Sequence, residues 1–181
     1  MNTLRKLWLT ALCAAVLTAM LPAQAEVTWD SVLNKIKTNK NYHLTYDYDG
    51  PQGIYSFDYD YDDGSIKTQI KDSKSDPTRK GTVIIYKKGA KQVIASTGSG
   101  TIARNLDHKD VVGRPFHESI WDMILRQVGG TPKVSAYKSG KKFVFPGGYT
   151  IWADKDSNIT RTERKAGTSP ETREFKNITW N

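Results

Sequence analysis

Between His43 and Ser65 the chain reads HLTYDYDGPQGIYSFDYDYDDGS, in which aromatic residues alternate with polar, mostly acidic ones. Strict alternation places successive side chains on opposite faces of a β-strand. Gly50–Gly53 and Asp62–Ser65 hold turn residues, and the second segment is typical of a tight hairpin turn. The stretch therefore predicts two long antiparallel strands with one aromatic and one acidic face, followed by a third strand from Ile66 to Lys71.

The period of two continues through most of the remaining chain. Further strands are predicted near residues 81–86, 92–96, 101–106, 134–137, 142–145, 149–153, 159–164 and 172–180. About ten antiparallel strands form a sheet too wide to lie flat, and such sheets curl. We therefore expect a mainly β (α+β) fold, a strongly curved antiparallel half-barrel.

Two segments instead have the period of an amphipathic helix. From Glu26 to Asn41, Trp29, Val32, Leu33 and Ile36 recur at spacings of three and four. From Pro115 to Val128 an apolar stripe ends at a pair of glycines, which is typical of a helix end; it comprises Phe116, Ile120, Trp121, Ile124 and Val128. We expect an N-terminal and a central helix that cover the concave face of the sheet.

The first 25 residues have the three parts of a cleavable signal peptide. Basic Arg5 and Lys6 precede an apolar run from Leu7 to Leu21, and Ala23-Gln24-Ala25 is a small-residue cleavage site. The rival interpretation is a membrane anchor, but the run is shorter than the roughly 20 apolar residues that span a membrane. We expect cleavage before Glu26, export to the periplasm, and one soluble domain over residues 26–181 with no transmembrane segment.

Composition narrows the possible partners and chemistry of the exported part. The one cysteine, Cys13, lies in the leader, so no disulfide or thiolate metal site is expected after cleavage. Loss of Arg5 and Lys6 lowers the formal net charge from +8 to +6. The cations are scattered, which argues against nucleic acid as a partner, although a cationic surface suits an envelope protein or an anionic lipid.

No residue pattern in the chain matches a known catalytic or metal-binding motif. The acidic run that begins at Asp58 has Asp63 and Gln69 where a calcium-binding EF-hand loop needs Gly and Glu. The three histidines lack the spacing of metal ligands, and no serine occupies a nucleophile elbow; the histidines are His43, His108 and His117. We therefore expect no enzymatic activity, no metal and no cofactor.

The aromatic face of the first hairpin has two interpretations. Its rings are either ordinary core beneath the helices or the wall of an apolar pocket whose phenolic hydroxyls face a lipid or another amphiphile. Five of its six rings carry a hydroxyl, which keeps the second interpretation open; the six are Tyr46, Tyr48, Tyr55, Phe57, Tyr59 and Tyr61.

The order of leader, amphipathic helix, long antiparallel strands, central helix and further strands resembles the LolA/LolB/RseB-like superfamily of periplasmic proteins. The stretches that carry the resemblance are residues 80–89 (KGTVIIYKKG), the helix at 119–128 with its following glycines, and residues 175–181 (FKNITWN). The resemblance implies a half-open curved sheet whose concave face holds acyl chains. Carrier members share a basic residue after an aromatic strand, whereas residues 58–63 here are acidic, so no family functional residue is transferred.

Two functions follow from these observations. The first is an exported protein that binds an apolar ligand, namely a lipid, an acyl chain or a lipoprotein, in a role like outer-membrane lipoprotein sorting. The second is an envelope sensor or protein-interaction module on the same fold without lipid carriage. For the first function, the resemblance implies a helical lid and an aromatic cradle as the ligand-binding residues: Val32, Leu33, Ile120, Trp121 and Ile124 in the lid, and Tyr46, Tyr48, Tyr55, Phe57, Tyr59 and Tyr61 in the cradle.

Overall fold

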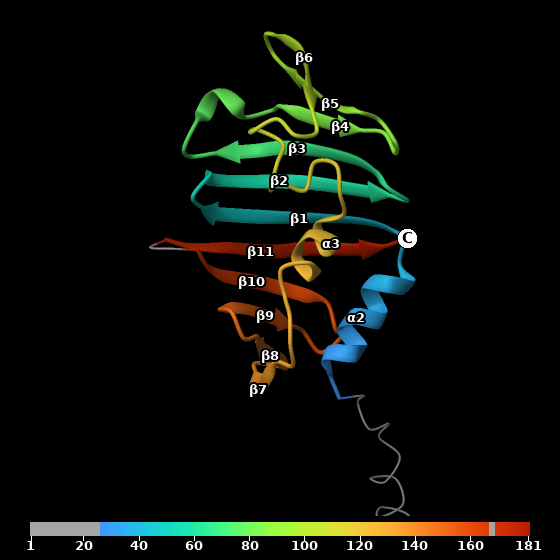
Figure 1. Ribbon diagram of the computed structural model, residues 1–181, viewed down its shortest axis with the longest axis vertical. Coiled ribbons are helices and arrows are strands. Elements are labelled where there is room, and N and C mark those ends of the chain that lie inside the picture. The colour runs from blue at the N-terminus through green and yellow to red at the C-terminus, as the bar shows by residue number, and fades with distance from the viewer. Residues whose placement is uncertain (1–25, 167–168) are drawn as a thin grey trace, which may run out of the picture.

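A computed structural model describes residues 26–166 and 169–181, in which eleven antiparallel strands form one curved sheet (Figure 1). The predicted signal peptide, residues 1–25, lies outside the described residues. In chain order the strands are β1 (Asn41–Gly50), β2 (Gly53–Asp62), β3 (Ser65–Ser73), β4 (Val83–Tyr86), β5 (Gln92–Thr97), β6 (Gly100–Asn105), β7 (Lys133–Tyr137), β8 (Gly140–Val144), β9 (Tyr149–Ala153), β10 (Ile159–Ala166) and β11 (Ser169–Trp180). Strands β6 and β7 are the two edges and do not pair with each other, so the predicted curved, unclosed antiparallel sheet is confirmed.

The sheet consists of two meanders that are joined by the pairing of β1 with β11. Strands β1 to β6 follow one another across one half and β7 to β11 across the other, and Tyr46 lies opposite Phe175 at the junction. The connection from β6 to β7, residues 106–132, must therefore pass from one edge of the sheet to the other. In Figure 1 this yellow and orange segment crosses in front of the strands.

The first two hairpins have the predicted strands and turns. Leu44 lies opposite Tyr59 and Tyr46 opposite Phe57, so the alternating aromatic residues share the buried face. Strand β2 ends at Asp62 and β3 begins at Ser65, which leaves Asp63 and Gly64 as a two-residue turn with φ of 39° and 95°. Both values are positive, as a type I′ turn requires, and glycine adopts such a conformation without strain.

Both helices exist, but they are shorter than predicted. The N-terminal helix α2 spans Trp29–Thr38 and begins at a capping box in which the Thr28 and Ser31 side chains each accept the other's backbone N–H. The central helix α3 spans only Ile120–Leu125, and residues 106–118 form turns instead. No helix of the described part of the chain is both long and apolar enough to cross a membrane.

The prediction of a helix from Pro115 was wrong because the apolar stripe does not reflect a continuous helix. The Ser119 hydroxyl accepts the backbone N–H of Asp122 at 3.4 Å, so the first turn of α3 is capped at Ser119. Phe116 is buried although its backbone is irregular, and thus contributes to the stripe from outside the helix. The burial of Phe116 outside the helix therefore produced the spacing of apolar residues that the sequence pattern assigned to a longer helix.

Helix α3 packs directly on the middle of the concave face. The Trp121 ring lies 4.8 Å from the Phe175 ring and 5.8 Å from the Tyr42 ring, centroid to centroid. The Tyr59 hydroxyl accepts the backbone N–H of Ile120 and donates to the carbonyl of Glu118, each at 3.2 Å. These contacts tie the start of α3 to the sheet.

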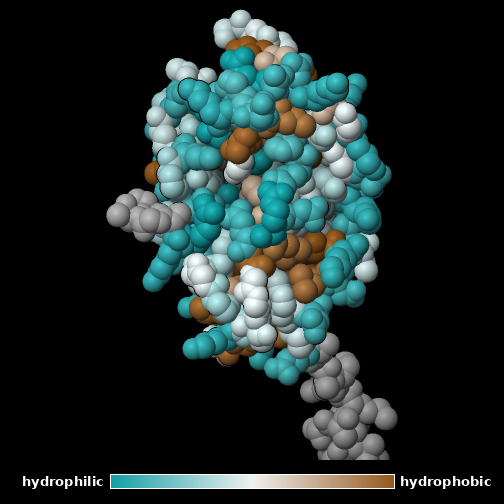
Figure 2. Space-filling view, viewed as in Figure 1, coloured by the Kyte–Doolittle hydropathy of each residue, from teal (hydrophilic) through white to brown (hydrophobic). Residues whose placement is uncertain are grey.

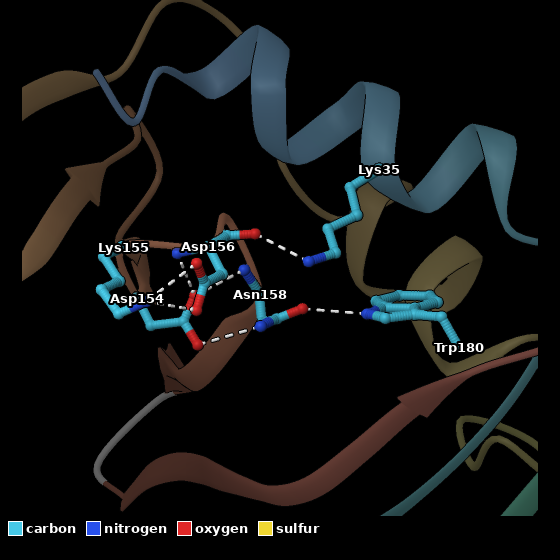
Figure 3. A network of polar contacts seen from close by, with 6 residues as sticks. All are labelled: Lys35, Asp154, Lys155, Asp156, Asn158 and Trp180. Atoms are coloured by element: carbon cyan, nitrogen blue, oxygen red, sulfur yellow. Dashed lines mark hydrogen bonds and ion pairs between the residues drawn. The ribbon is translucent and has the colours of Figure 1, made fainter. Parts of the chain in front are cut away.

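Helix α2 packs near the β7 edge of the sheet, against β8 and the β9–β10 turn. The Trp29 ring lies 5.4 Å from the Phe143 ring. Figure 3 shows the polar side of this contact, where Lys35 Nζ donates to the carbonyl of Asp156 at 2.7 Å and Trp180 Nε1 donates to Asn158 Oδ1 at 2.9 Å. The helix is thereby linked to the turn and to the end of β11.

Truncation of Trp121 tests whether α3 is a fixed part of the core. The side chain is 1% exposed, so Trp121→Ala should lower the free energy of unfolding by about 3–5 kcal/mol, measured by urea denaturation. Val134→Ala is the control, because Val134 on edge strand β7 is 54% exposed and should cost less than about 0.5 kcal/mol. A loss near 1 kcal/mol for Trp121→Ala would instead indicate a weakly held lid.

Candidate functional site

The sequence-predicted binding residues lie mainly in the hydrophobic core. Nine of the eleven are buried, whereas Leu33 and Tyr61 are half-buried. The rings of the aromatic hairpin contact one another and α3, and Tyr46 stacks on Phe57 with 4.7 Å between centroids. The structure brings the hairpin residues together with Ile120, Trp121 and Ile124, while Val32 and Leu33 belong to α2. Contact of these residues with a ligand stays a prediction.

An apolar cavity of about 170 Å³ lies between strands β3–β6 and the covering segment 106–118. The sheet contributes aliphatic side chains on one side, and Val111 and Phe116 close the other. Figure 2 shows hydrophobic residues between hydrophilic ones in the upper part of this face. The cavity is lined by Ile70, Arg79, Thr82, Ile84, Val93, Ala95, Thr97, Ile102, Arg104, Asp110, Val111, Arg114 and Phe116.

Other hollows lie on the outer side of the sheet. One, of about 480 Å³, is lined by Ile85 and Ile94 beside two lysines. Another, of about 330 Å³, is lined mostly by polar and charged residues of β9 to β11 and the β7–β8 turn. Strands and their turns alone form both. The cavity beneath residues 106–118 is enclosed from two sides, as ligand pockets usually are, and we therefore take it as the candidate site.

Three arginines line the cavity, and two of them have no ion pair within residues 26–166 and 169–181. Arg79 pairs with Asp76 at 3.0 Å, whereas Arg104 and Arg114 contact no carboxylate there. Asp110 also lines the cavity and is 3.7 Å from His108 Nδ1. The site thus combines an aliphatic interior with a positively charged margin, which suits an amphiphilic ligand.

A second, smaller hollow of about 20 Å³ adjoins this cavity, since Arg114 and Phe116 line both. Its other walls include the buried Arg173, the rings of the aromatic hairpin and Gln52. The Arg173 guanidinium lies 5.2 Å from the Tyr48 ring centroid and forms an ion pair with Glu171. We call this place the arginine hollow.

Burial favours the protonated form of two phenolic hydroxyls of the hairpin. It raises the pKa of Tyr46 and of Tyr59, and in Tyr46 the positive charges of Arg173 and Arg114 partly oppose the rise. A neutral phenol has an O–H to donate. The Tyr46 hydroxyl beside the arginine hollow is therefore a hydrogen-bond donor near neutral pH.

On the outer face of the hairpin the structure assembles a cluster that sequence spacing missed. His43 Nδ1 is 2.8 Å from Asp60 Oδ1 and 3.5 Å from Asp58 Oδ1. His43 lies directly opposite Asp60 in the β1–β2 pairing, so the ladder brings together residues that are distant along the chain. If the register of the β1–β2 pairing had been derived from the turn at Gly50–Gly53, the cluster could have been predicted from the sequence.

The cavity residues were likewise absent from the sequence-based site. The strands that carry Ile84, Val93 and Ala95 were predicted, but their inner faces gave no sign of facing a cavity instead of packed core. Arg104 and Arg114 lie at the end of β6 and in an irregular segment, where no periodicity marks them. Only the path of residues 106–118 across the sheet defines the site.

No protein-family model and no curated protein sequence matches the chain. Among solved structures it matches an uncharacterized conserved protein from Thermus thermophilus (TM-score 0.53, 8% identity, 84% of this chain and 86% of that one). It also matches lipoprotein LppX from Mycobacterium tuberculosis (0.51, 12%, 84% and 92%). A LolA superfamily protein from Nitrosomonas europaea has a TM-score of 0.41 (10%, 86% and 94%). At these identities, the likenesses concern the fold alone.

The buried tyrosines predict a loss of stability in alkali. A tyrosine in the unfolded chain has a pKa of about 10, and burial raises the pKa of Tyr59 in the folded protein well above it. The resulting contribution to stability is fully present below about pH 10 and is lost as the pH rises above it, because the unfolded chain releases its proton first. Urea denaturation between pH 8 and pH 11 measures the loss.

Tyr59→Phe should make this pH dependence shallower, whereas Tyr137→Phe, at a 37% exposed side chain, should leave it unchanged. Equal slopes for the wild-type protein and Tyr59→Phe would contradict the assignment.

Proposed function

We propose that this protein is an extracytoplasmic binding protein that holds the acyl chain of a lipid in the cavity beneath residues 106–118. The observation that carries the proposal is the cavity itself, an aliphatic space of about 170 Å³ beside a concave face that is otherwise packed with aromatic side chains. Each methylene group that leaves water for such a space contributes roughly 0.8 kcal/mol. A few methylene groups therefore suffice for measurable affinity.

The size of the cavity limits what it can enclose. Ligand pockets typically measure about 300–1,000 Å³, so about 170 Å³ accommodates part of one chain and not a whole diacyl lipid. Ile102 lines the cavity and is 43% exposed, so the cavity reaches the surface at edge strand β6. The remainder of a larger ligand, such as the rest of a lipid or lipoprotein, would stay outside.

The predicted leader and the fold shared with a lipoprotein of Mycobacterium tuberculosis support an extracytoplasmic, periplasmic location. On this proposal the protein acts by binding and not by catalysis, with the apolar side chains of the cavity solvating an acyl chain. A more specific form of the proposed function is a role in carrying lipids or lipoproteins within the cell envelope, like outer-membrane lipoprotein sorting.

Native mass spectrometry of the protein isolated from the compartment to which it is exported tests the proposal. The expected result is a population with an added mass that corresponds to one lipid, together with uptake of a fluorescent fatty-acyl probe. A bare protein mass without probe uptake would contradict it. Capture of an envelope protein by the ligand-free chain would then favour the protein-interaction module.

Filling the cavity should abolish binding of the probe. Ala95 lines the cavity from β5, so Ala95→Trp should lower affinity for the fluorescent acyl probe at least about tenfold, since an indole occupies the space of several methylene groups. Ile94→Trp is the matched control: Ile94 is the neighbouring residue, points to the outer face and is 38% exposed.

Unfolding midpoints of both variants establish that each is folded. Equal loss of probe affinity in the two variants, or no loss in Ala95→Trp, would show that the acyl chain of the probe binds outside this cavity.

A further inference from the structure

The arginine hollow contains buried hydrogen-bond donors without acceptors. Arg173 is 3% exposed, and its Nε has no hydrogen-bond partner among the described residues; the same holds for the buried Nε of Arg114. A buried donor left unpaired costs roughly 1–3 kcal/mol, and more when it is charged. Two such donors in the wall of one hollow point to an acceptor that binds there.

The charges around the hollow are also unbalanced. Glu171 is a single buried carboxylate that pairs with two guanidinium groups, those of Arg173 and Arg164. Arg114 forms no ion pair within the described ranges, 26–166 and 169–181. Two guanidinium groups thus share one carboxylate and the third has none, and uncompensated positive charge in a partly desolvated place favours an anion.

The dimensions of the hollow favour a small anionic group. About 20 Å³ slightly exceeds the 10–15 Å³ that one water molecule needs, so the hollow admits a carboxylate oxygen more readily than a phosphate. The guanidinium fork matches a planar carboxylate, and charge-assisted hydrogen bonds of this kind are among the strongest in proteins. The Tyr46 hydroxyl at the same wall can add a further donor.

Arg114 connects this hollow to the apolar cavity, because it lines both. We propose that the ligand is a single-chain fatty acid whose chain lies in the cavity and whose carboxylate binds Arg114, with Arg173 behind it. This inference rests on the proposed function and adds the class of ligand and the position of its head group. Arg104, which lines the cavity but not the arginine hollow, has no part in binding the head group.

The test compares the binding of a fatty acid, the fatty alcohol of the same chain length and the corresponding alkyl phosphate by displacement of a fluorescent acyl probe. The wild-type protein should bind the acid about tenfold or more tightly than the alcohol, as a charge-assisted hydrogen bond provides. Arg114→Gln should remove this preference by weakening binding of the acid. Arg104→Gln is the matched control and should retain the preference.

Each other outcome overturns a defined part of the inference. If the acid and the alcohol bind equally to the wild-type protein, the head-group site is wrong while the proposed function stands. If neither binds, the proposed function fails as well. Loss of the preference for the acid in Arg104→Gln alone would place the head group beside Arg104. Tighter binding of the alkyl phosphate than of the fatty acid would show that the head group is a phosphate.

Free anions distinguish a lipid head group from a simple anion site. Acetate and inorganic phosphate at millimolar concentration should leave the bound acyl probe in place, because without a chain they gain nothing from the cavity. Displacement of the probe by inorganic phosphate would contradict the inference. Unchanged urea midpoints of Arg114→Gln and Arg104→Gln show that both variants are folded.

Discussion

The pairing of β1 with β11 is the constraint on which the rest of the structure depends. It joins two meanders into one sheet whose edges, β6 and β7, are far apart in strand order yet consecutive in the chain. The connection between them has to cross the concave face, and a backbone that crosses a buried surface needs partners for its polar groups. The Tyr59 hydroxyl meets this need at residues 118–120, where the connection turns into α3, and the Tyr42 hydroxyl hydrogen-bonds the Ser119 side chain there.

This crossing divides the concave face into two parts with different properties. In the middle, α3 inserts Trp121 among the rings of β1 and β11, and the space is filled. Toward β6 the connection is an irregular segment that spans the sheet without filling it, and the apolar cavity is the result. Of the hydroxyl groups that suggested a pocket for an amphiphile in the sequence, that of Tyr59 anchors the connection and so positions the cover of the site.

The sequence predicted more of the fold than of the site. Alternation determined the two faces of the β1–β2 hairpin, and Asp63-Gly64 marked the tight turn between β2 and β3, because both are local properties of the chain. The central helix was predicted too long, since Phe116 is buried by an irregular segment that mimics helical spacing. The cavity and its arginines depend on contacts between segments distant in sequence, such as those that place Arg114 beside Arg173, and no local period records them.

The position of a bound acyl chain decides whether the cavity beneath residues 106–118 is the ligand site. A fatty acid that carries a photoreactive diazirine in its chain can be cross-linked to the wild-type protein, and the modified peptides can be identified by mass spectrometry. The account predicts labels on β4 to β6 and on residues 106–118, which enclose the cavity. Labels confined to α2 or to the aromatic residues of β1 and β2 would contradict it.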